Sequence, residues 1–176
     1  MLDPKTTTQI RLLKENYKAF PDKAHYTMKY ADITNVDKFS NDLKVVVDLI
    51  NEEITDWADV PNYETVLRRF AANSHCLLFY YNDECIGWNW GNDNVCLDWQ
   101  TNIQNLPSGE LYGGGCFVSR NVSRPADAGL YNYNKIFDYW INEMGYHTIY
   151  GYIDNWNKPA FRVNFQNGLT VHNYLK

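Results

Sequence analysis

This sequence of 176 residues lacks long apolar runs, and it carries no excess of positive charge. No window approaches the roughly 18 uninterrupted apolar residues that a membrane-spanning helix requires. Residues 1–18 also lack the apolar core of a signal peptide. These absences predict a cytoplasmic protein without a membrane partner.

Cysteine is scarce and scattered. The cysteines form no C-x-x-C pair and no ligand cluster with histidine, so the sequence predicts no metal site and favours reduced, buried thiols. The four are Cys76, Cys85, Cys96 and Cys116.

Positive charge is also in short supply, and the formal net charge is −5. A general nucleic-acid-binding protein needs clustered lysine and arginine for its phosphate contacts, so the charge argues against that class. The last third nevertheless holds several basic residues, which favours a locally basic pocket for a small phosphorylated ligand. They are Arg120, Arg124, Lys135 and Lys158.

Hydrophobic periodicity, by contrast, is present along most of the chain. Apolar residues at helical spacing predict helices over residues 5–20, 39–54, 63–70, 129–144 and 157–167. Strand patterns cover residues 26–33, 75–81, 84–90, 111–119, 146–153 and the end of the chain. No repeat or low-complexity linker interrupts them, so the sequence predicts one α/β domain.

The last third places the start of a helix directly after a strand. Residues 124–129 form the turn between the strand at 111–119 and the helix at 129–144. Free backbone N–H groups at the start of a helix bind anions, phosphate above all. The turn therefore predicts a phosphate site.

Two motifs here resemble those of the GNAT (GCN5-related N-acetyltransferase) superfamily. In that family, a loop of the form Q/R-x-x-G-x-G/A follows the fourth strand and holds the pyrophosphate of coenzyme A. The matching run is Arg124-Pro125-Ala126-Asp127-Ala128-Gly129, in which Asp127 replaces a usual glycine. We expect Asp127 to turn away from the phosphates and cap the helix that follows. An ordinary capped turn is the alternative.

The second motif keeps every interval of the family pattern. It consists of Asn157-Lys158-Pro159-Ala160, Asn164 and Gly168-Leu169. In the family, this asparagine contacts the pantetheine arm. Asn157 is also suited to be the N-cap of its helix, and the two roles are compatible.

The resemblance implies acetyl-coenzyme A as cosubstrate. It also implies a set of cosubstrate-binding residues spread over the fourth strand, the turn and the last helix. They are Phe117, Val118, Arg124, Ala126, Asp127, Ala128, Gly129, Leu130, Asn157 and Ala160.

Asn164 departs from the family pattern at a catalytic position. Many members place a tyrosine there to protonate the departing thiolate, whereas an asparagine amide cannot act as an acid. General acid help is worth roughly 10²–10⁴ in rate, so the loss slows the reaction without forbidding it. Nearby tyrosines are substitutes among which the sequence does not choose: Tyr131, Tyr133, Tyr150 and Tyr152.

The remaining catalytic groups are a general base and an oxyanion donor. Glu110, at the entry to the fourth strand, is our first candidate for the base, with Asp98 second. A backbone N–H near Phe117 or Val118 would hold the oxyanion. Of the two interpretations of residues 113–115, close ligand approach or a bulge, we favour the bulge.

The resemblance implies a mixed, mostly antiparallel central sheet flanked by helices. It assigns residues 1–25 to an N-terminal helical extension and 26–176 to the acyltransferase domain. Seven residues after Leu169 allow one final strand where the family has two. That side of the acceptor site is thus open, closed by the leading helix or completed by a second copy, and an unpaired edge favours a homodimer.

The function expected from the resemblance is direct transfer of an acetyl or other short acyl group from acyl-coenzyme A to a primary amine. The acceptor is a small molecule or a protein amino group. Two alternatives stay open: a module that binds the coenzyme without turnover, and an acyltransferase that takes longer chains from a carrier protein. A carbohydrate- or peptide-binding protein is a more distant fourth, suggested by the abundant aromatic residues.

Overall fold

The computed structural model describes residues 6–55, 61–94, 105–121 and 127–175. Its described strands form one seven-stranded sheet in the order β2-β3-β4-β5-β6-β1-β7. Every neighbouring pair is antiparallel except β5 and β6, which are parallel. The predicted mixed, mostly antiparallel sheet is therefore confirmed.

The elements follow one another along the chain as the periodicity predicts, except at the N-terminus. The strands are β1 (Thr7–Leu13), β2 (Tyr26–Ala31), β3 (His75–Tyr81), β4 (Glu84–Asn92), β5 (Glu110–Val118), β6 (Thr148–Asp154) and β7 (Thr170–Leu175). The α-helices are α1 (Val36–Glu53), α2 (Tyr63–Ala71), α3 (Ala128–Asp138) and α4 (Lys158–Gln166). A short 3-10 helix, η1 (Lys14–Asn16), follows β1, and a π-helix, η2 (Tyr139–Glu143), extends α3. Among the described residues, no helix is both long and apolar enough to cross a membrane.

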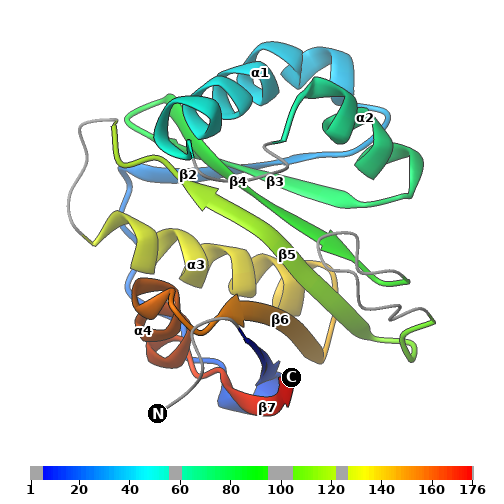
Figure 1. The fold of residues 1–176 in the computed structure, drawn as a ribbon, viewed down its shortest axis with the longest axis vertical. Coiled ribbons are helices and arrows are strands. Elements are labelled where there is room, and N and C mark those ends of the chain that lie inside the picture. The colour runs from blue at the N-terminus through cyan, green and yellow to red at the C-terminus, as the bar shows by residue number, and fades with distance from the viewer. Residues whose placement is uncertain (1–5, 56–60, 95–104, 122–126, 176) are drawn as a thin grey trace.

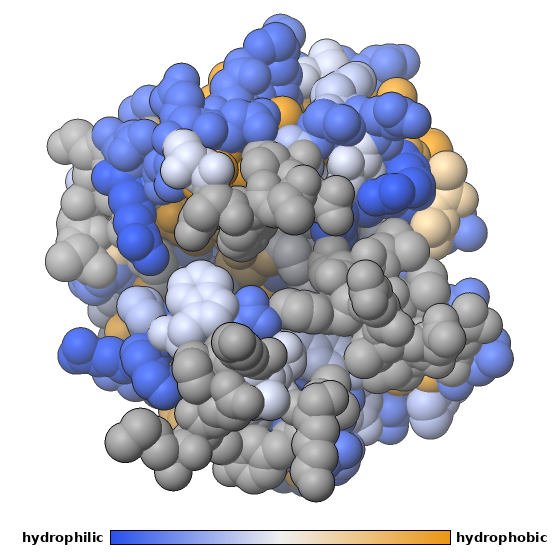
Figure 2. Space-filling view, viewed as in Figure 1, coloured by the Kyte–Doolittle hydropathy of each residue, from blue (hydrophilic) through white to orange (hydrophobic). Residues whose placement is uncertain are grey.

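The helices cover the sheet on both faces (Figure 1). Apolar side chains of α1 and α2 pack on one face of β2, β3 and β4, where Trp88 and Trp90 are buried. Apolar side chains of α3 and η2 pack on the other face, with Ala160 and Phe161 of α4 beside them. The outward surface over α1 and α2 is mainly hydrophilic (Figure 2), as expected for helices whose apolar stripe faces a sheet.

The predicted helix over residues 5–20 is wrong. Residues 7–13 form β1, which pairs with β6 on one side and β7 on the other. Its position inside the sheet buries side chains on both faces, including Thr8, Ile10 and Leu12. A strand buried on both faces lacks the alternation that distinguishes a strand from a helix.

The N-terminal segment therefore belongs to the central sheet and is not a helical extension. It lies between β6 and β7, on the side of the sheet away from β2. A leading helix was one of the three arrangements expected at that side of the acceptor site, and the leading segment contributes a strand there instead. Completion by a second copy stays a prediction.

Candidate functional site

The gap between β5 and β6 is the central feature of the site. The two strands pair over only three residues each, Glu110–Tyr112 with Thr148–Tyr150. Beyond that point β5 pairs only with β4 among the described strands, so its edge from residue 113 to 118 faces the gap. An open strand edge offers backbone N–H and C=O groups to a ligand.

A bulge in β5 helps to turn the strand away from β6. The register with β4 shifts between Trp88 and Trp90, opposite the glycine triplet. Gly115 has a φ of +64°, a conformation that glycine adopts without steric cost. The bulge interpretation of residues 113–115 is therefore confirmed.

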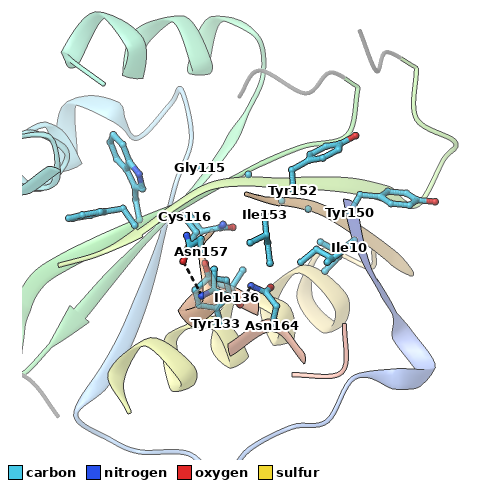
Figure 3. Close-up of a pocket in the computed structure, with 18 of the residues that line it drawn as sticks. Ile10, Gly115, Cys116, Tyr133, Ile136, Tyr150, Tyr152, Ile153, Asn157 and Asn164 are labelled. Carbon is cyan, nitrogen blue, oxygen red and sulfur yellow. Dashed lines mark hydrogen bonds between the residues drawn. The ribbon is translucent and has the colours of Figure 1, made fainter. Parts of the chain in front are cut away.

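A cavity of about 870 Å³ fills the gap and reaches both faces of the sheet. On one face it is lined by side chains of α3 and α4, among them Tyr133, Ile136 and Asn164. On the other face it is lined by residues of α2. Figure 3 shows Tyr150 and Tyr152 pointing away from the Tyr133 side, as the alternation of β6 requires.

The cavity thus has two mouths, which we name the α3–α4 mouth and the α2 mouth. Ligands entering by the two mouths would meet at the open edge of β5.

The start of α4 forms part of the α3–α4 mouth. Asn157 Oδ1 accepts a hydrogen bond from the Ala160 N–H at 3.2 Å, so Asn157 is the N-cap of α4. The same residue lines the cavity together with Ala160. The two roles predicted for Asn157 are therefore geometrically compatible, while its contact with a coenzyme stays a prediction.

Asn164 is buried, with 4% of its surface exposed. Its Nδ2 donates to the Ala160 carbonyl at 2.8 Å, which commits one amide proton to the helix backbone. The Tyr133 hydroxyl lies beside the Asn164 side chain and the Cys116 thiol. Burial is the main cause that raises the pKa of Tyr133 well above its ordinary value, followed by the nearby Cys116. Tyr133 therefore stays protonated at neutral pH.

Geometry separates the four tyrosines that the sequence left equivalent. Tyr131 does not line the cavity, and it stacks on Tyr26 with ring centroids 5.7 Å apart. Tyr150 and Tyr152 line the cavity from the opposite face of the sheet. Tyr133 is the one that comes next to Asn164.

The Asp127 side chain pairs with residues from the segment before β2 and from β2 itself, and it does not cap α3. Its Oδ2 lies 2.6 Å from Lys23 Nζ, and its Oδ1 accepts from the Tyr26 hydroxyl at 3.1 Å. Lys23 is the main cause that lowers the pKa of Asp127. The predicted cap is wrong because these two partners take both carboxylate oxygens.

The first turn of α3 consequently has no side-chain cap, and its N-cap residue, Asp127, is followed by no acidic residue in that turn. Gly129 has open space where a side chain would lie, with no atom within 4 Å of an added Cβ. Ala128 and Leu130 belong to the same turn, whereas Arg124 and Ala126 lie outside the described residues. The phosphate site predicted at residues 124–129 stays a prediction. Its described residues, 127–129, have no side-chain cap over them and leave space beside Gly129.

A carboxylate of the protein itself binds the backbone that follows β5. Glu53, at the end of α1, accepts hydrogen bonds from the backbone N–H groups of Arg120 and Asn121 at 2.9 and 3.1 Å. The Ser119 hydroxyl also donates to this carboxylate. Since these amides are taken, the open backbone donors at this end of the site, among the residues that the structure describes, are those at the start of α3.

The predicted general base, Glu110, lies where β5 and β6 are still paired. It does not line the cavity, and it lies beside Tyr150, whose pKa is raised by burial first and Glu110 second. Asp98 lies outside the described residues. Asp154 lines the cavity and accepts a hydrogen bond from the Thr7 hydroxyl at 3.1 Å. Asp154 was not predicted from the sequence. It could have been, because it follows Tyr150 and Tyr152 at every second position, at the end of a predicted strand, and therefore shares their face.

Phe117 and Val118 pair with Trp88 and Gly87 of β4. Phe117 lines the cavity, whereas Val118 packs on the α3 side of the core. The structure thus brings together residues of the second motif, Asn157, Ala160 and Asn164, with Phe117 of β5 around one cavity. The described residues of the predicted phosphate turn, Asp127 to Leu130, do not line it. Trp156, which is 56% exposed, stands at its rim.

A search of solved structures finds chains with the same architecture. A GCN5-related N-acetyltransferase from Sphaerobacter thermophilus has a TM-score of 0.64 and 13% identity, over 96% of this chain and 49% of that one. A tandem GNAT protein from the clavulanic acid biosynthesis pathway has a TM-score of 0.59 and 11% identity, over 97% and 51%. An aminoglycoside acetyltransferase from an uncultured soil metagenomic sample has a TM-score of 0.54 and 13% identity, over 86% and 96%.

This chain spans between 49% and 58% of the length of the first four matched structures. A scan against protein-family models finds no match, and a search of curated proteins finds no significantly similar sequence. At such low identity the shared feature is the fold. The chain has the GNAT fold that its two motifs predict.

Proposed function

We propose that this chain is an N-acyltransferase that moves an acetyl or other short acyl group from acyl-coenzyme A to a primary amine. The observation that carries the proposal is the cavity between β5 and β6, which opens on both faces of the sheet. Two substrates entering from opposite faces would meet there in the geometry that direct transfer requires.

The α3–α4 mouth suits the coenzyme. The pantetheine arm contains amide groups, which can pair with the open edge of β5 as an added strand would. Asn157 and Ala160 line the cavity and would contact that arm. The first-turn amides of α3, from Ala128 to Leu130, would bind the pyrophosphate, because an uncapped helix start attracts anions.

The reaction proceeds without a covalent intermediate on the protein. The amine nitrogen attacks the thioester carbon, a backbone N–H near Phe117 or Val118 holds the oxyanion, and the C–S bond then breaks. Tyr133 donates its hydroxyl proton to the leaving thiolate, whose pKa is about 8.5. Asn164 acts as a positioning residue for Tyr133.

The attacking amine must also lose a proton. Asp154 lines the cavity and would take this proton through water, with Glu110 acting from beside Tyr150 as the other candidate base. We further propose a cytoplasmic location, since the described cysteines are unpaired thiols. The end strands of the described sheet, β2 and β7, each pair with one strand only, which would allow a homodimer to form at either edge.

A coenzyme-binding module without turnover is the second candidate, because Asn164 cannot donate a proton in place of tyrosine. Two measurements separate the candidates. Calorimetry with acetyl-coenzyme A at tens of micromolar protein tests binding, and release of free thiol with a panel of primary amines tests transfer. Saturable binding with amine-dependent thiol release supports transfer, whereas binding without release supports the module.

Absence of saturable binding would remove both candidates. An acyl carrier protein loaded with a longer chain is then the donor to test, because the same cavity would serve that alternative.

A further inference from the structure

We propose that the acceptor is a small primary amine that carries an aromatic ring, and that this ring packs on Trp156 at the rim of the cavity. This inference rests on the proposed acyl transfer and names the substrate class of the same site. It depends on three observations: the exposure of Trp156, the turn that holds it, and the aromatic side chains that line the same cavity.

Trp156 presents a large apolar surface to solvent. It is 56% exposed, whereas Trp88, Trp90 and Trp140 are each 2% exposed or less. Of the ring contacts between described residues, none involves Trp156, although it lines the cavity. A single exposed indole needs no explanation elsewhere on a surface, but at the rim of a cavity it is suited to contact what the cavity binds.

The turn that carries Trp156 is fixed at both ends. The N–H of Asn157 donates to the Asp154 carbonyl at 2.8 Å, which closes a β-turn around Asn155 and Trp156. Asn155 is buried, and its N–H donates to the Thr6 carbonyl at 3.0 Å. The backbone that carries the indole is therefore held before any ligand arrives, which lowers the entropy lost on binding.

This turn also joins the groups that the two substrates need. Asp154, a candidate base, lines the cavity from β6, and Asn157, the predicted contact of the pantetheine arm, lines it at the start of α4. The ends of a β-turn lie within about 7 Å of each other. A ring packed on Trp156 would thus need only a short chain to carry its amine toward Asp154 and the thioester.

Aromatic side chains line the cavity on the α2 side of the gap as well. Phe117 of β5 packs with the core under α1 and α2, beside the buried Trp88. Tyr150 of β6 points to the same face (Figure 3). Arg69 of α2 borders this wall, with its guanidinium against the bulge at Gly115. Both strands at the gap thus present a ring on this face, and such rings pack favourably on an aromatic ligand.

The aromatic character of the acceptor is a separate claim from its size. Any apolar group of similar area gains from leaving water at the rim. An aromatic ring gains more, because stacking or edge-to-face contact with the indole adds to the burial. An amine without a bulky group would leave Trp156 in water and gain neither contribution.

The test compares three acceptors that share an ethylamine chain, with acetyl-coenzyme A and a thiol-release readout. They are 2-phenylethylamine, 2-cyclohexylethylamine and ethylamine. We expect kcat/KM for 2-phenylethylamine to exceed that for ethylamine by at least about tenfold, from burial of the ring. It should exceed that for the cyclohexyl compound by about threefold, within the range of an aromatic pair.

Trp156→Ala should lower kcat/KM for 2-phenylethylamine about tenfold more than that for ethylamine, which collapses the ratio. Trp156→Phe should keep the ratio within about threefold of wild type, because it keeps a ring. Phe165→Ala is the matched control and should leave the ratio unchanged: Phe165 is an aromatic residue of α4 that is 45% exposed and does not line the cavity. Circular dichroism and calorimetry with acetyl-coenzyme A confirm that each variant is folded and binds the cosubstrate.

Equal kcat/KM values for 2-phenylethylamine and either of the other two amines would overturn this inference and leave the proposed transfer standing. A ratio that survives Trp156→Ala would do the same, as would thiol release with other primary amines but with none of these three. Binding of acetyl-coenzyme A with no release for any amine would overturn the transfer and this inference and leave the coenzyme-binding module. Absence of cosubstrate binding would overturn the proposed function and this inference together.

Discussion

Lys23 Nζ lies 2.6 Å from Asp127 Oδ2, so a residue from the segment between β1 and β2 pairs with a carboxylate at the start of α3. The ammonium also lies 3.9 Å from the centroid of the Tyr131 ring. This pairing offsets the repulsion that Asp127 would exert on a pyrophosphate bound at the helix start. A departure from the family motif is thus compensated by a distant part of the chain.

Lys23→Ala should weaken acetyl-coenzyme A binding by about fivefold, the range of an exposed ion pair, because it leaves the Asp127 charge uncompensated. Lys23→Ala combined with Asp127→Asn should restore the affinity. Calorimetry measures both. Lys44→Ala, which breaks the exposed pair with Asp48 on α1, is the control and should leave affinity unchanged. A double variant as weak as Lys23→Ala would contradict this account.

Tyr133→Phe should lower kcat by about 10²-fold, the lower end of general acid catalysis, because a thiolate needs less help than a stronger base. Tyr131→Phe should leave kcat unchanged, since Tyr131 lies outside the cavity. Steady-state thiol release compares the two variants. Because burial raises the Tyr133 pKa, the wild-type rate should show no loss from tyrosine ionisation up to about pH 10. Equal rates for the two variants would exclude Tyr133 as the acid.

Gly115→Ala should destabilise the fold by about 1–2 kcal/mol, because alanine is strained at a φ of +64°. Its methyl group would also press on the Arg69 guanidinium. Urea unfolding measures the effect. Gly129→Ala is the stability control: its site is helical and open, so alanine should stabilise by about 0.5–1 kcal/mol. Similar midpoints for both variants would argue against strain at the bulge.

Glu53→Ala should cost about 1–3 kcal/mol of unfolding free energy, because it removes the acceptor for the Arg120 and Asn121 amides and the Ser119 hydroxyl. Glu52→Ala, a change of an exposed neighbour, should cost much less. Chemical denaturation of both variants decides the point. Identical unfolding curves for the Glu53 and Glu52 variants would show that the hydrogen bonds from Glu53 to the end of β5 do not stabilise the fold.

Periodic segments with one buried face were predicted well from the sequence. The helix at 39–54 and the hairpin around Asn82-Asp83 match α1 and the β3–β4 turn, where both turn residues have positive φ. The predicted helix at residues 5–20 failed because Ile10, Leu13, Tyr17 and Phe20 lie at helical spacing by coincidence. Only pairing with distant strands makes that segment extended.

The site was predictable where it depends on local motifs and not where it depends on packing. The resemblance to the GNAT family implied Asn157 and Ala160 as coenzyme-binding residues, and both line the cavity, while their contact with a coenzyme stays a prediction. Arg69 was missed because its place beside Gly115 follows from how α2 packs over β5. Likewise, neighbouring tyrosines such as Tyr131 and Tyr133 look alike in the sequence, and only the orientation of α3 separates them.

The position of β1 has a consequence for folding. This strand is made long before both of its partners, β6 and β7, which follow every other described element of the sheet in the chain. Pairing over such a sequence separation is slow, because a large loop must close before the strand gains any contact. A nascent chain must therefore keep β1 apart from both partners until they have been made, and the apolar side chains of Ile10 and Leu12 stay available for aggregation or chaperone binding during that time.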